Sequence, residues 1–367
     1  MRIAIDVTTL RGRISGVGYY TARIVEHLAE ALGSEGSEVS ELLLLSNGPV
    51  DRALPVGARA VPGFRFPIRS VWMQFLLPLL LRRLRPDLVH YTNYLAPAVS
   101  PGPYVVSVHD MSLTRTPEHH TLKKRLLTAS LVPRVARRAR LILTPSLATS
   151  RDVVEDLGLP ADRVVSIPYA AAEMFRPVAE RPPYPGLDRP YFLFVGTIEP
   201  RKNLVRLLNA FAEFARDVPG VNLVLSGQRG WKCEEIYARA KEKDVADRIV
   251  FLDYVDEATL PSLYSHALAC VYPSLFEGFG FPVVEAMSCG TPVLTSNTTS
   301  LGEIGTGAAL LVNPFDTQAL ANGLRSLARD PALREDLRTR GFARAATFSW
   351  QETGRRTIEA YQKALDC

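Results

Sequence analysis

The chain has 367 residues, of which 47% are hydrophobic and 22% charged, and it carries a net charge of +5. This composition is typical of a globular protein of about two domains, and it excludes disordered, collagen-like and coiled-coil proteins. The four cysteines form no Cys-x-x-Cys pair. That spacing argues against a disulfide framework and a structural zinc site, and it favours a reducing, cytoplasmic compartment.

Neither a secretory signal nor a membrane span is expected. Met1 is followed at once by a strand pattern, without a signal-peptide cleavage region. The longest apolar run, from Val71 to Leu81, is interrupted by Gln74 and Pro78. It is shorter than the roughly 20 residues that a transmembrane helix needs.

Short apolar runs alternate with helix-length amphipathic segments along the first half of the chain. We expect strands at Ile3–Val7, Leu42–Leu45, Leu88–Tyr91, Val105–Val108, Leu141–Leu143 and Val164–Ile167. The expected helices are Val17–Leu32, Val71–Arg85, Leu122–Arg138 and Ser146–Leu157, the last with Ser146 as its N-cap and Gly158 as its stop. This alternation predicts a parallel sheet covered by helices on both faces.

A proline-dense segment at residues 178–190 predicts a linker, because such a segment continues neither a helix nor a sheet. The strand–helix pattern then restarts, with strands expected at Tyr191–Val195, Leu223–Leu225, Ile249–Leu252, Ala269–Tyr272, Val293–Thr295 and Ala309–Val312. We therefore expect an α/β protein with two tandem, doubly wound, Rossmann-like domains facing a central cleft, at 1–177 and 191–348. Residues 349–367 are expected to form a helix that packs back toward the N-terminal domain.

Basic residues gather in the first half of the chain. Up to Arg176 there are 22 basic and 15 acidic residues, a balance of +7, whereas the remainder has 21 and 23, a balance of −2. This asymmetry indicates either an anionic partner or an ordinary solvated helix face. Aromatic residues are not interleaved with the charges, so nucleic acid is not expected as a partner.

Two glycines follow the first predicted strand, where a helix begins. Gly16 and Gly18 would let backbone N–H groups approach an anion at the positive end of that helix. The third glycine of the dinucleotide fingerprint is missing, so a purely structural turn is the alternative.

The first strand of the second half leads to Arg201 and Lys202, at the junction with the following helix. Permanently charged donors at this place would clamp a phosphate group. A surface salt bridge is the alternative.

The most specific stretch runs from Pro273 to Met287. Pro282 suits the first position of a helix, Glu277 would lie in the loop before it, and Glu285 would lie in about the first turn. Two carboxylates around a glycine-rich helix start suit a nucleotide-sugar, because the helix end accepts the pyrophosphate and the carboxylates accept hydrogen bonds from hydroxyls. The alternative is a charged surface loop.

Glu277 and Glu285 resemble the E-x7-E motif of retaining glycosyltransferases of family 4, which have the two-Rossmann GT-B fold. Further matches follow the family's order along the whole chain, at 15–21, 107–110, 196–203, 251–255 and 300–304. The chain is especially similar to the mannosyltransferase-like branch that builds bacterial surface polysaccharides.

The resemblance implies a role for each matching residue. Glu277 would hold hydroxyls of the donor sugar, Glu285 the ribose, and Arg201 with Lys202 the diphosphate. Backbone donors would come from Gly278, Phe279, Gly280 and Phe281, and the nucleoside pocket would be lined by Ser226, Gly227, Tyr254 and Val255. His109 would face the reacting sugar, and Gly16 and Gly18 would line the floor of the cleft. Thr197 stands where some members have a phosphate-binding arginine, which places more of the clamp on Arg201.

These residues together predict hexosyl transfer from a nucleoside-diphosphate sugar with retention at the anomeric carbon. No Asp-x-Asp metal signature precedes the phosphate site, so neither a metal nor a cofactor is expected. The branch resemblance alone favours GDP-mannose as donor, and a glycan or lipid-linked saccharide as acceptor at the inner face of the plasma membrane, with peripheral contact to anionic lipid. A nucleotide-sugar 2-epimerase and an NAD-dependent oxidoreductase are the alternative enzymes. A nucleotide-sugar sensor without activity is a third alternative.

Overall fold

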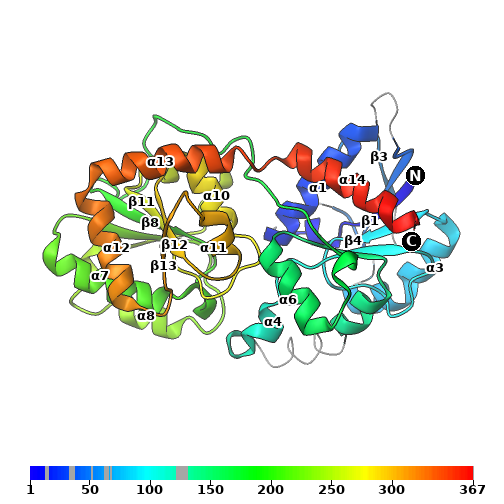
Figure 1. Cartoon of the computed structure of the whole chain (residues 1–367), viewed down its shortest axis with the longest axis horizontal. Coiled ribbons are helices and arrows are strands. Elements are labelled where there is room, and N and C mark those ends of the chain that lie inside the picture. Colours follow the sequence, from blue (N-terminus) through cyan, green and yellow to red (C-terminus); the bar gives the residue numbers. More distant parts are fainter. Residues whose placement is uncertain are drawn as a thin grey trace. The chain divides into compact units, whose positions relative to one another are not determined.

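The computed structural model describes residues 1–12, 16–32, 38–50, 53–61, 66, 68–120 and 131–366. The chain divides into two compact units, one formed by Met1–Tyr169 with Ser349–Cys367 and the other by Ala170–Phe348. The sequence predicted that the first domain ends at residue 177. In the structure the second unit begins at Ala170, so residues 170–177 and the proline-dense segment belong to it. Residues 349–367 fall within the first unit, where α14 (Trp350–Asp366) lies beside α1 (Gly16–Leu32) (Figure 1).

The first unit contains a seven-stranded parallel sheet in the order β3-β2-β1-β4-β5-β6-β7. Its strands are β1 (Arg2–Asp6), β2 (Glu41–Leu45), β3 (Ala58–Val61), β4 (Leu88–Tyr91), β5 (Tyr104–Ser107), β6 (Leu141–Thr144) and β7 (Val164–Ser166). The central strands are almost completely buried, as expected of a parallel sheet covered on both faces. The sequence analysis missed β3, because this edge strand is partly exposed and has no apolar pattern.

Two helices of the first unit differ in detail from the prediction. The segment expected as one helix at Val71–Arg85 consists of α2 (Arg69–Val71), a π-helical turn at Trp72–Leu76 and α3 (Leu77–Leu84). The expected helix at Leu122–Arg138 is helical at 131–138, and its earlier residues lie outside the described part of the chain. Between residues 104 and 166, the described part of the chain also contains α4 (Ser112–Arg115) and α6 (Leu147–Leu157), and the latter has the predicted Ser146 cap and Gly158 stop.

The second unit contains a six-stranded parallel sheet in the order β10-β9-β8-β11-β12-β13. All six strands were predicted: β8 (Tyr191–Val195), β9 (Asn222–Ser226), β10 (Ile249–Asp253), β11 (Ala269–Tyr272), β12 (Val293–Ser296) and β13 (Leu310–Val312). Its helices are α7 (Leu204–Asp217), α8 (Glu234–Ala240), α9 (Leu260–Ser265), α10 (Phe281–Ser288), α11 (Thr299–Gly305), α12 (Thr317–Arg329) and α13 (Pro331–Ala345). In each unit the order of strands reverses beside the first strand, β1 or β8, and such a switch point at the carboxyl edge is where ligands bind.

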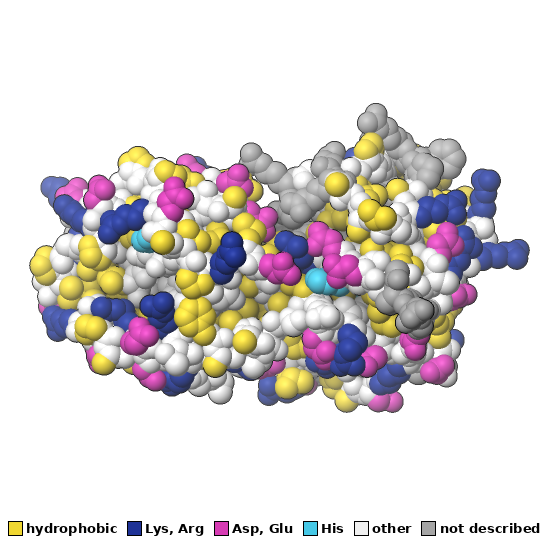
Figure 2. All heavy atoms as spheres, turned by 90° about the horizontal axis from the view of Figure 1, so that it is seen from above, with side chains coloured by type: hydrophobic (Ala, Val, Ile, Leu, Met, Phe, Trp, Pro, Cys, Tyr) yellow, Lys and Arg dark blue, Asp and Glu magenta, His cyan; other side chains and the backbone are white. Residues whose placement is uncertain are grey.

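Charged side chains of both signs are distributed over both units. Figure 2 shows Lys and Arg interspersed with acidic and hydrophobic side chains on the face that it presents. Within the described residues, no helix is both long and apolar enough to cross a bilayer, and no group of three His, Cys, Asp or Glu side chains is arranged to hold a metal ion.

Candidate active site

The turn after β8 brings Arg201 and Lys202 to the carboxyl edge of the second sheet. A short 3-10 turn at Pro200–Lys202 ends at Asn203, whose φ of 62° is a left-handed conformation that Asn tolerates. The Asn203 amide donates to the carbonyls of Pro273 and Pro314, at 3.1 and 2.6 Å. These bonds tie the turn to the segments that follow β11 and β13.

Glu277 is the centre of a buried cluster of charged side chains. Its Oε1 accepts from Lys202 Nζ at 2.6 Å and from the Tyr272 hydroxyl at 3.0 Å, and its Oε2 accepts from Arg201 Nη1 at 2.7 Å. Arg201 also donates from Nη2 to Glu199 Oε1 at 2.8 Å. Lys202 and Glu277 are 6% and 9% exposed, so both the surface salt bridge and the charged surface loop are wrong for these residues.

The cluster fixes the protonation of its members. Burial by itself would raise the pKa of Glu277, but the charges of Arg201 and Lys202 outweigh it and lower this pKa to about 2. Burial and the neighbouring Arg201 lower the pKa of Lys202, against the opposing effect of Glu277 and Glu199. Glu277 is therefore a carboxylate at physiological pH, able to accept hydrogen bonds from hydroxyl groups.

The glycine-rich segment after β11 is held against α11. Ser300 Oγ lies 2.8 Å from the carbonyl of Glu277 and 2.9 Å from that of Phe279. Gly280 has a φ of 113°, and a Cβ there would lie 2.6 Å from the Leu301 side chain, so only glycine suits this close approach. The helix begins at Phe281, which makes Pro282 its second residue instead of its first. The Phe279 ring is buried against Phe281 and Phe348, so only its backbone is placed to serve a ligand.

Glu285 is the fifth residue of α10, one position further into the helix than a start at Pro282 would give. The Tyr264 hydroxyl donates to Glu285 Oε2 at 2.9 Å. Glu285 as a whole is half-buried. Protein atoms nevertheless surround the carboxyl group, and this burial raises its pKa from 4.5 to about 7, against the bond from Tyr264. The two glutamates of the motif thus have opposite electrostatic environments.

Three neighbouring strands bring the expected nucleoside-pocket residues together. Gly196 N donates to Ser226 O at 2.9 Å, and Gly227 N donates to Asp253 O at 2.6 Å. A Cβ on Gly227 would lie 1.9 Å from Gly196 O, so the two turns touch through their backbones. Beyond Asp253, Tyr254 is 57% exposed whereas Val255 is 4% exposed. The Tyr254 side chain is thus accessible to solvent, whereas that of Val255 is not.

His109 follows β5 at the carboxyl edge of the first sheet. Its Nε2 lies 2.7 Å from the Thr92 carbonyl, to which it donates, and its Nδ1 lies 2.8 Å from the Tyr169 hydroxyl. Burial lowers the pKa of His109, while Thr92 O and Asp110 oppose the change. Gly16 is the first residue of α1 and Gly18 is buried in its first turn. The same helix carries Tyr20, whose ring packs edge-on against His109 with centroids 5.0 Å apart.

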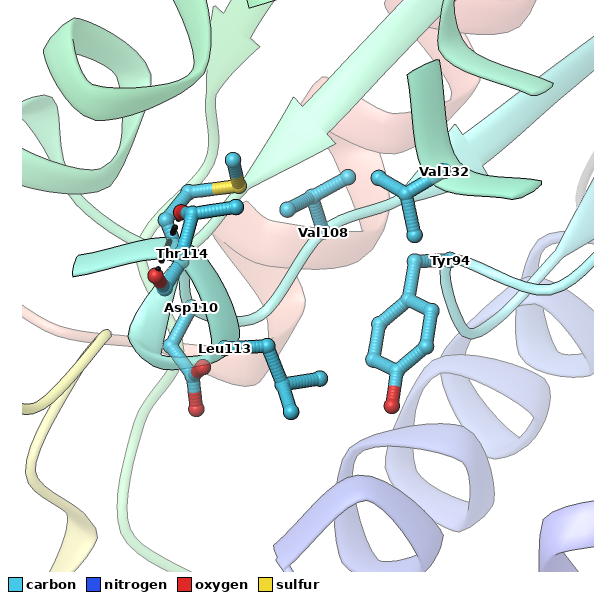
Figure 3. A pocket seen from close by; sticks show the side chains of 7 residues that line it. Tyr94, Val108, Asp110, Leu113, Thr114 and Val132 are labelled. Atoms are coloured by element: carbon cyan, nitrogen blue, oxygen red, sulfur yellow. Dashed lines mark hydrogen bonds between the residues drawn. The ribbon is translucent and has the colours of Figure 1, made fainter. Parts of the chain in front are cut away.

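A small pocket of the first unit is lined by the two chain neighbours of His109, Val108 and Asp110, among others (Figure 3). Asp110 Oδ1 accepts from the Ser112 amide and hydroxyl, at 2.9 and 2.6 Å, and so holds the first residue of α4. The pocket is lined by Tyr94, Val108, Asp110, Met111, Leu113, Thr114 and Val132. Its mainly apolar lining distinguishes it from the charged cluster of the second unit.

Sequence reasoning missed several residues that hold the expected ones in place. Tyr272 and Tyr264 donate to the two glutamates, and Glu199 pairs with Arg201. In the first unit, Thr92 and Tyr169 hold the ring of His109. Tyr272 and Thr92 could have been found from the sequence, because each is a polar or aromatic residue at the carboxyl end of a buried strand. Tyr264 and Tyr169 are distant in the chain from the residues that they bond to, and no local pattern indicates those contacts.

Comparison with known proteins agrees with this architecture. Residues 180–344 match the family "Glycosyl transferases group 1", and residues 16–170 match "Glycosyltransferase Family 4". The O-antigen chain mannosyltransferase B of Escherichia coli is 30% identical over 99% of this chain and 100% of that protein. A sucrose-phosphate synthase of Thermosynechococcus elongatus has a TM-score of 0.76 at 23% identity, covering 98% of both chains. HepE of Anabaena, solved with UDP and glucose, has a TM-score of 0.76 at 18% identity, covering 99% of both.

Proposed function

The chain belongs to the group 1 glycosyltransferases with the GT-B fold, and from this premise we propose that it transfers a mannosyl group from GDP-mannose with retention of configuration. The acceptor would be a glycan or lipid-linked saccharide in the synthesis of a surface polysaccharide. The observation that carries the proposal is the buried cluster of Glu277, Arg201 and Lys202 at the carboxyl edge of the second sheet. Neither the epimerase nor the NAD-dependent oxidoreductase is supported by the relatives.

In this proposal the cluster is the donor site in its ligand-free state. On donor binding, Arg201 and Lys202 would exchange some of their hydrogen bonds to Glu277 for hydrogen bonds to the diphosphate. The N-terminus of α10 would add backbone donors. Glu277 would then accept hydroxyls of the sugar, and Glu285 those of the ribose. Because the cations stabilise the departing diphosphate, this site needs no metal ion.

The sugar comes from the relatives. The Escherichia coli protein that matches this chain over essentially the full length of both is a mannosyltransferase. The serotype-specific mannosyltransferase WbdA of the same organism is 31% identical over 62% of this chain. HepE was solved with UDP and glucose, so UDP-glucose is the informative competitor.

A donor-hydrolysis and transfer assay with excess chelator tests the proposal. We expect GDP-mannose to be turned over at least about 10-fold faster than UDP-glucose, GDP-fucose or UDP-galactose, since a site built to hydrogen-bond one sugar leaves polar groups unpaired with another. Chelator should leave the rate within a factor of about two. Another donor that is turned over as fast as GDP-mannose or faster would overturn the mannosyl assignment, and activity that returns only with magnesium or manganese would overturn the metal-free mechanism.

We also propose that the first unit contacts anionic membrane through the helix from Arg69 to Leu84. Trp72, Met73 and Leu77 are buried, but Phe75 and Leu79 are 68% and 59% exposed, one helical turn apart. The next turn presents exposed Arg82 and Arg83. An apolar strip followed by cations is typical of helices that lie in the lipid interface. The sequence also suggests that Lys123, Lys124 and Arg125 serve a lipid-linked acceptor or an anionic membrane, but these residues lie outside the described part of the chain.

The double variant Phe75→Ser with Leu79→Ser is therefore expected to bind vesicles rich in phosphatidylglycerol about 10-fold more weakly, because two apolar side chains no longer enter the lipid. Co-sedimentation measures the change. Phe315→Ser is the control, since Phe315 is 62% exposed but lies in the second unit. Equal binding by wild type and the double variant would remove this helix from the membrane contact.

A further inference from the structure

An aromatic cluster lies where the chain passes between the two units. The chain leaves the first unit after Tyr169 and returns to it at Ser349. The Tyr169 ring stacks on that of Trp350, with centroids 5.8 Å apart and planes at 11°. The Tyr20 ring packs on Tyr169 at 4.5 Å and on His109 at 5.0 Å. The chain thus crosses between the units at two places, after Tyr169 and before Ser349, and the stack of Tyr169 on Trp350 brings both crossing points to the residue whose hydroxyl bonds to His109.

A chain of buried hydrogen bonds connects the aromatic cluster, through Tyr20, to α14. His90 Nδ1 lies 2.7 Å from the Tyr361 hydroxyl of α14, and its Nε2 lies 2.8 Å from Ser107 Oγ. Ser107 Oγ in turn lies 3.0 Å from the Tyr20 hydroxyl. All four side chains are completely or almost completely buried. The position of the Tyr20 ring is thus set by α14 and by the two central strands β4 and β5.

The bonds of His109 define its tautomer. A carbonyl only accepts, so Thr92 O requires the proton of His109 on Nε2. Nδ1 of the neutral ring then carries a lone pair, and the Tyr169 hydroxyl is its donor. Burial keeps the pKa of Tyr169 well above its ordinary value of 10, so the phenol retains the proton that it donates.

We propose that Tyr169 is a positioning residue for His109, and that Tyr20, His90 and Trp350 hold Tyr169 in place for this task. The proposal rests on the proposed function and on the role that the family resemblance implies for His109, which is to face the reacting sugar. Both ring nitrogens of His109 are engaged within the first unit. The orientation of the ring, and of the backbone after β5, therefore depends on a residue adjacent to the crossing point.

The variant Tyr169→Phe tests the proposal, because it removes only the hydroxyl and leaves the stack with Trp350. We expect kcat to fall about 10-fold while KM for the donor stays within a factor of two, since a slightly misplaced group slows the reaction more than it weakens binding. In the ligand-free protein, the 15N resonance of His109 Nδ1, assigned by its loss in His109→Asn, is expected to shift. Trp350→Leu, which keeps the hydroxyl but removes the stacked ring, should change kcat in the same direction.

Tyr104→Phe is the matched control, because Tyr104 is a buried tyrosine of the same unit whose hydroxyl donates to Val135 O at 2.8 Å, away from His109. It should lose similar thermal stability without a change in kcat or in the His109 resonance. Equal kcat for both variants, or an unchanged Nδ1 resonance in Tyr169→Phe, would overturn the positioning role. The NMR measurement needs no substrate, so it separates failure of this inference from failure of the proposed function.

Discussion

Glu277→Gln is expected to lower kcat for the donor by at least about 100-fold and to lower the free energy of unfolding by about 3 kcal/mol. Glutamine keeps the volume of the side chain but leaves Lys202 buried without its carboxylate partner. In the proposed mechanism it also removes the charged acceptor for the sugar hydroxyls. Single-turnover kinetics and urea denaturation at pH 7.5 measure the two effects.

The double variant Glu277→Gln with Lys202→Met separates the loss of turnover from the loss of stability. Removing both ends of a buried ion pair costs less stability than removing one, so the double variant should recover much of the lost free energy of unfolding without recovering turnover. The folded pKa of Glu277 is lowered to about 2, so its stabilising effect is present above the ordinary carboxyl pKa and is lost only as the pH falls through 2. The stability loss should therefore be constant from pH 6 to 8. Wild-type turnover in Glu277→Gln would exclude this residue from the sugar site.

The fold was predictable from the sequence because its signals are local. Buried parallel strands are short apolar runs, and every strand of the second sheet was recovered from them. The edge strand β3 was missed because only buried strands show such a run. The π-helical turn at Trp72–Leu76 was missed because the apolar pattern does not distinguish it from an α-helical turn.

The site was predictable only in part, because its residues depend on partners that are distant in the chain. The spacing of Glu277 and Glu285 indicated two carboxylates at one helix start, but not that one would be paired with two cations and the other with a phenol. Likewise, His109 was identified by its motif, whereas its partner Tyr169 lies 60 residues away and has no motif of its own. Local spacing identifies which groups are present, and the tertiary fold decides which of them are charged.

The same substitution at the second glutamate is expected to have the opposite effect on stability. Glu285→Gln should raise the free energy of unfolding by about 2 kcal/mol at pH 8 while weakening donor binding at least about 10-fold. The folded protein favours the protonated form of Glu285, whose pKa is about 7, so the wild type loses stability as the pH rises from 4.5 through 7. Glutamine does not ionise, and its oxygen still accepts from Tyr264.

Thermal melts from pH 4.5 to 8.5 and calorimetric titration with GDP test this expectation. The melting temperatures of wild type and Glu285→Gln should be equal near pH 4.5 and diverge up to about pH 7, with the variant higher. If the carboxylate serves the ribose, the gain in stability and the loss of affinity have one cause, because the group that is costly to ionise in the empty site is the one that accepts the ribose hydroxyls. A variant that melts at or below the wild type at pH 8 would show that burial does not oppose ionisation of Glu285. A stabilised variant with unchanged GDP affinity would instead assign the ribose to another residue.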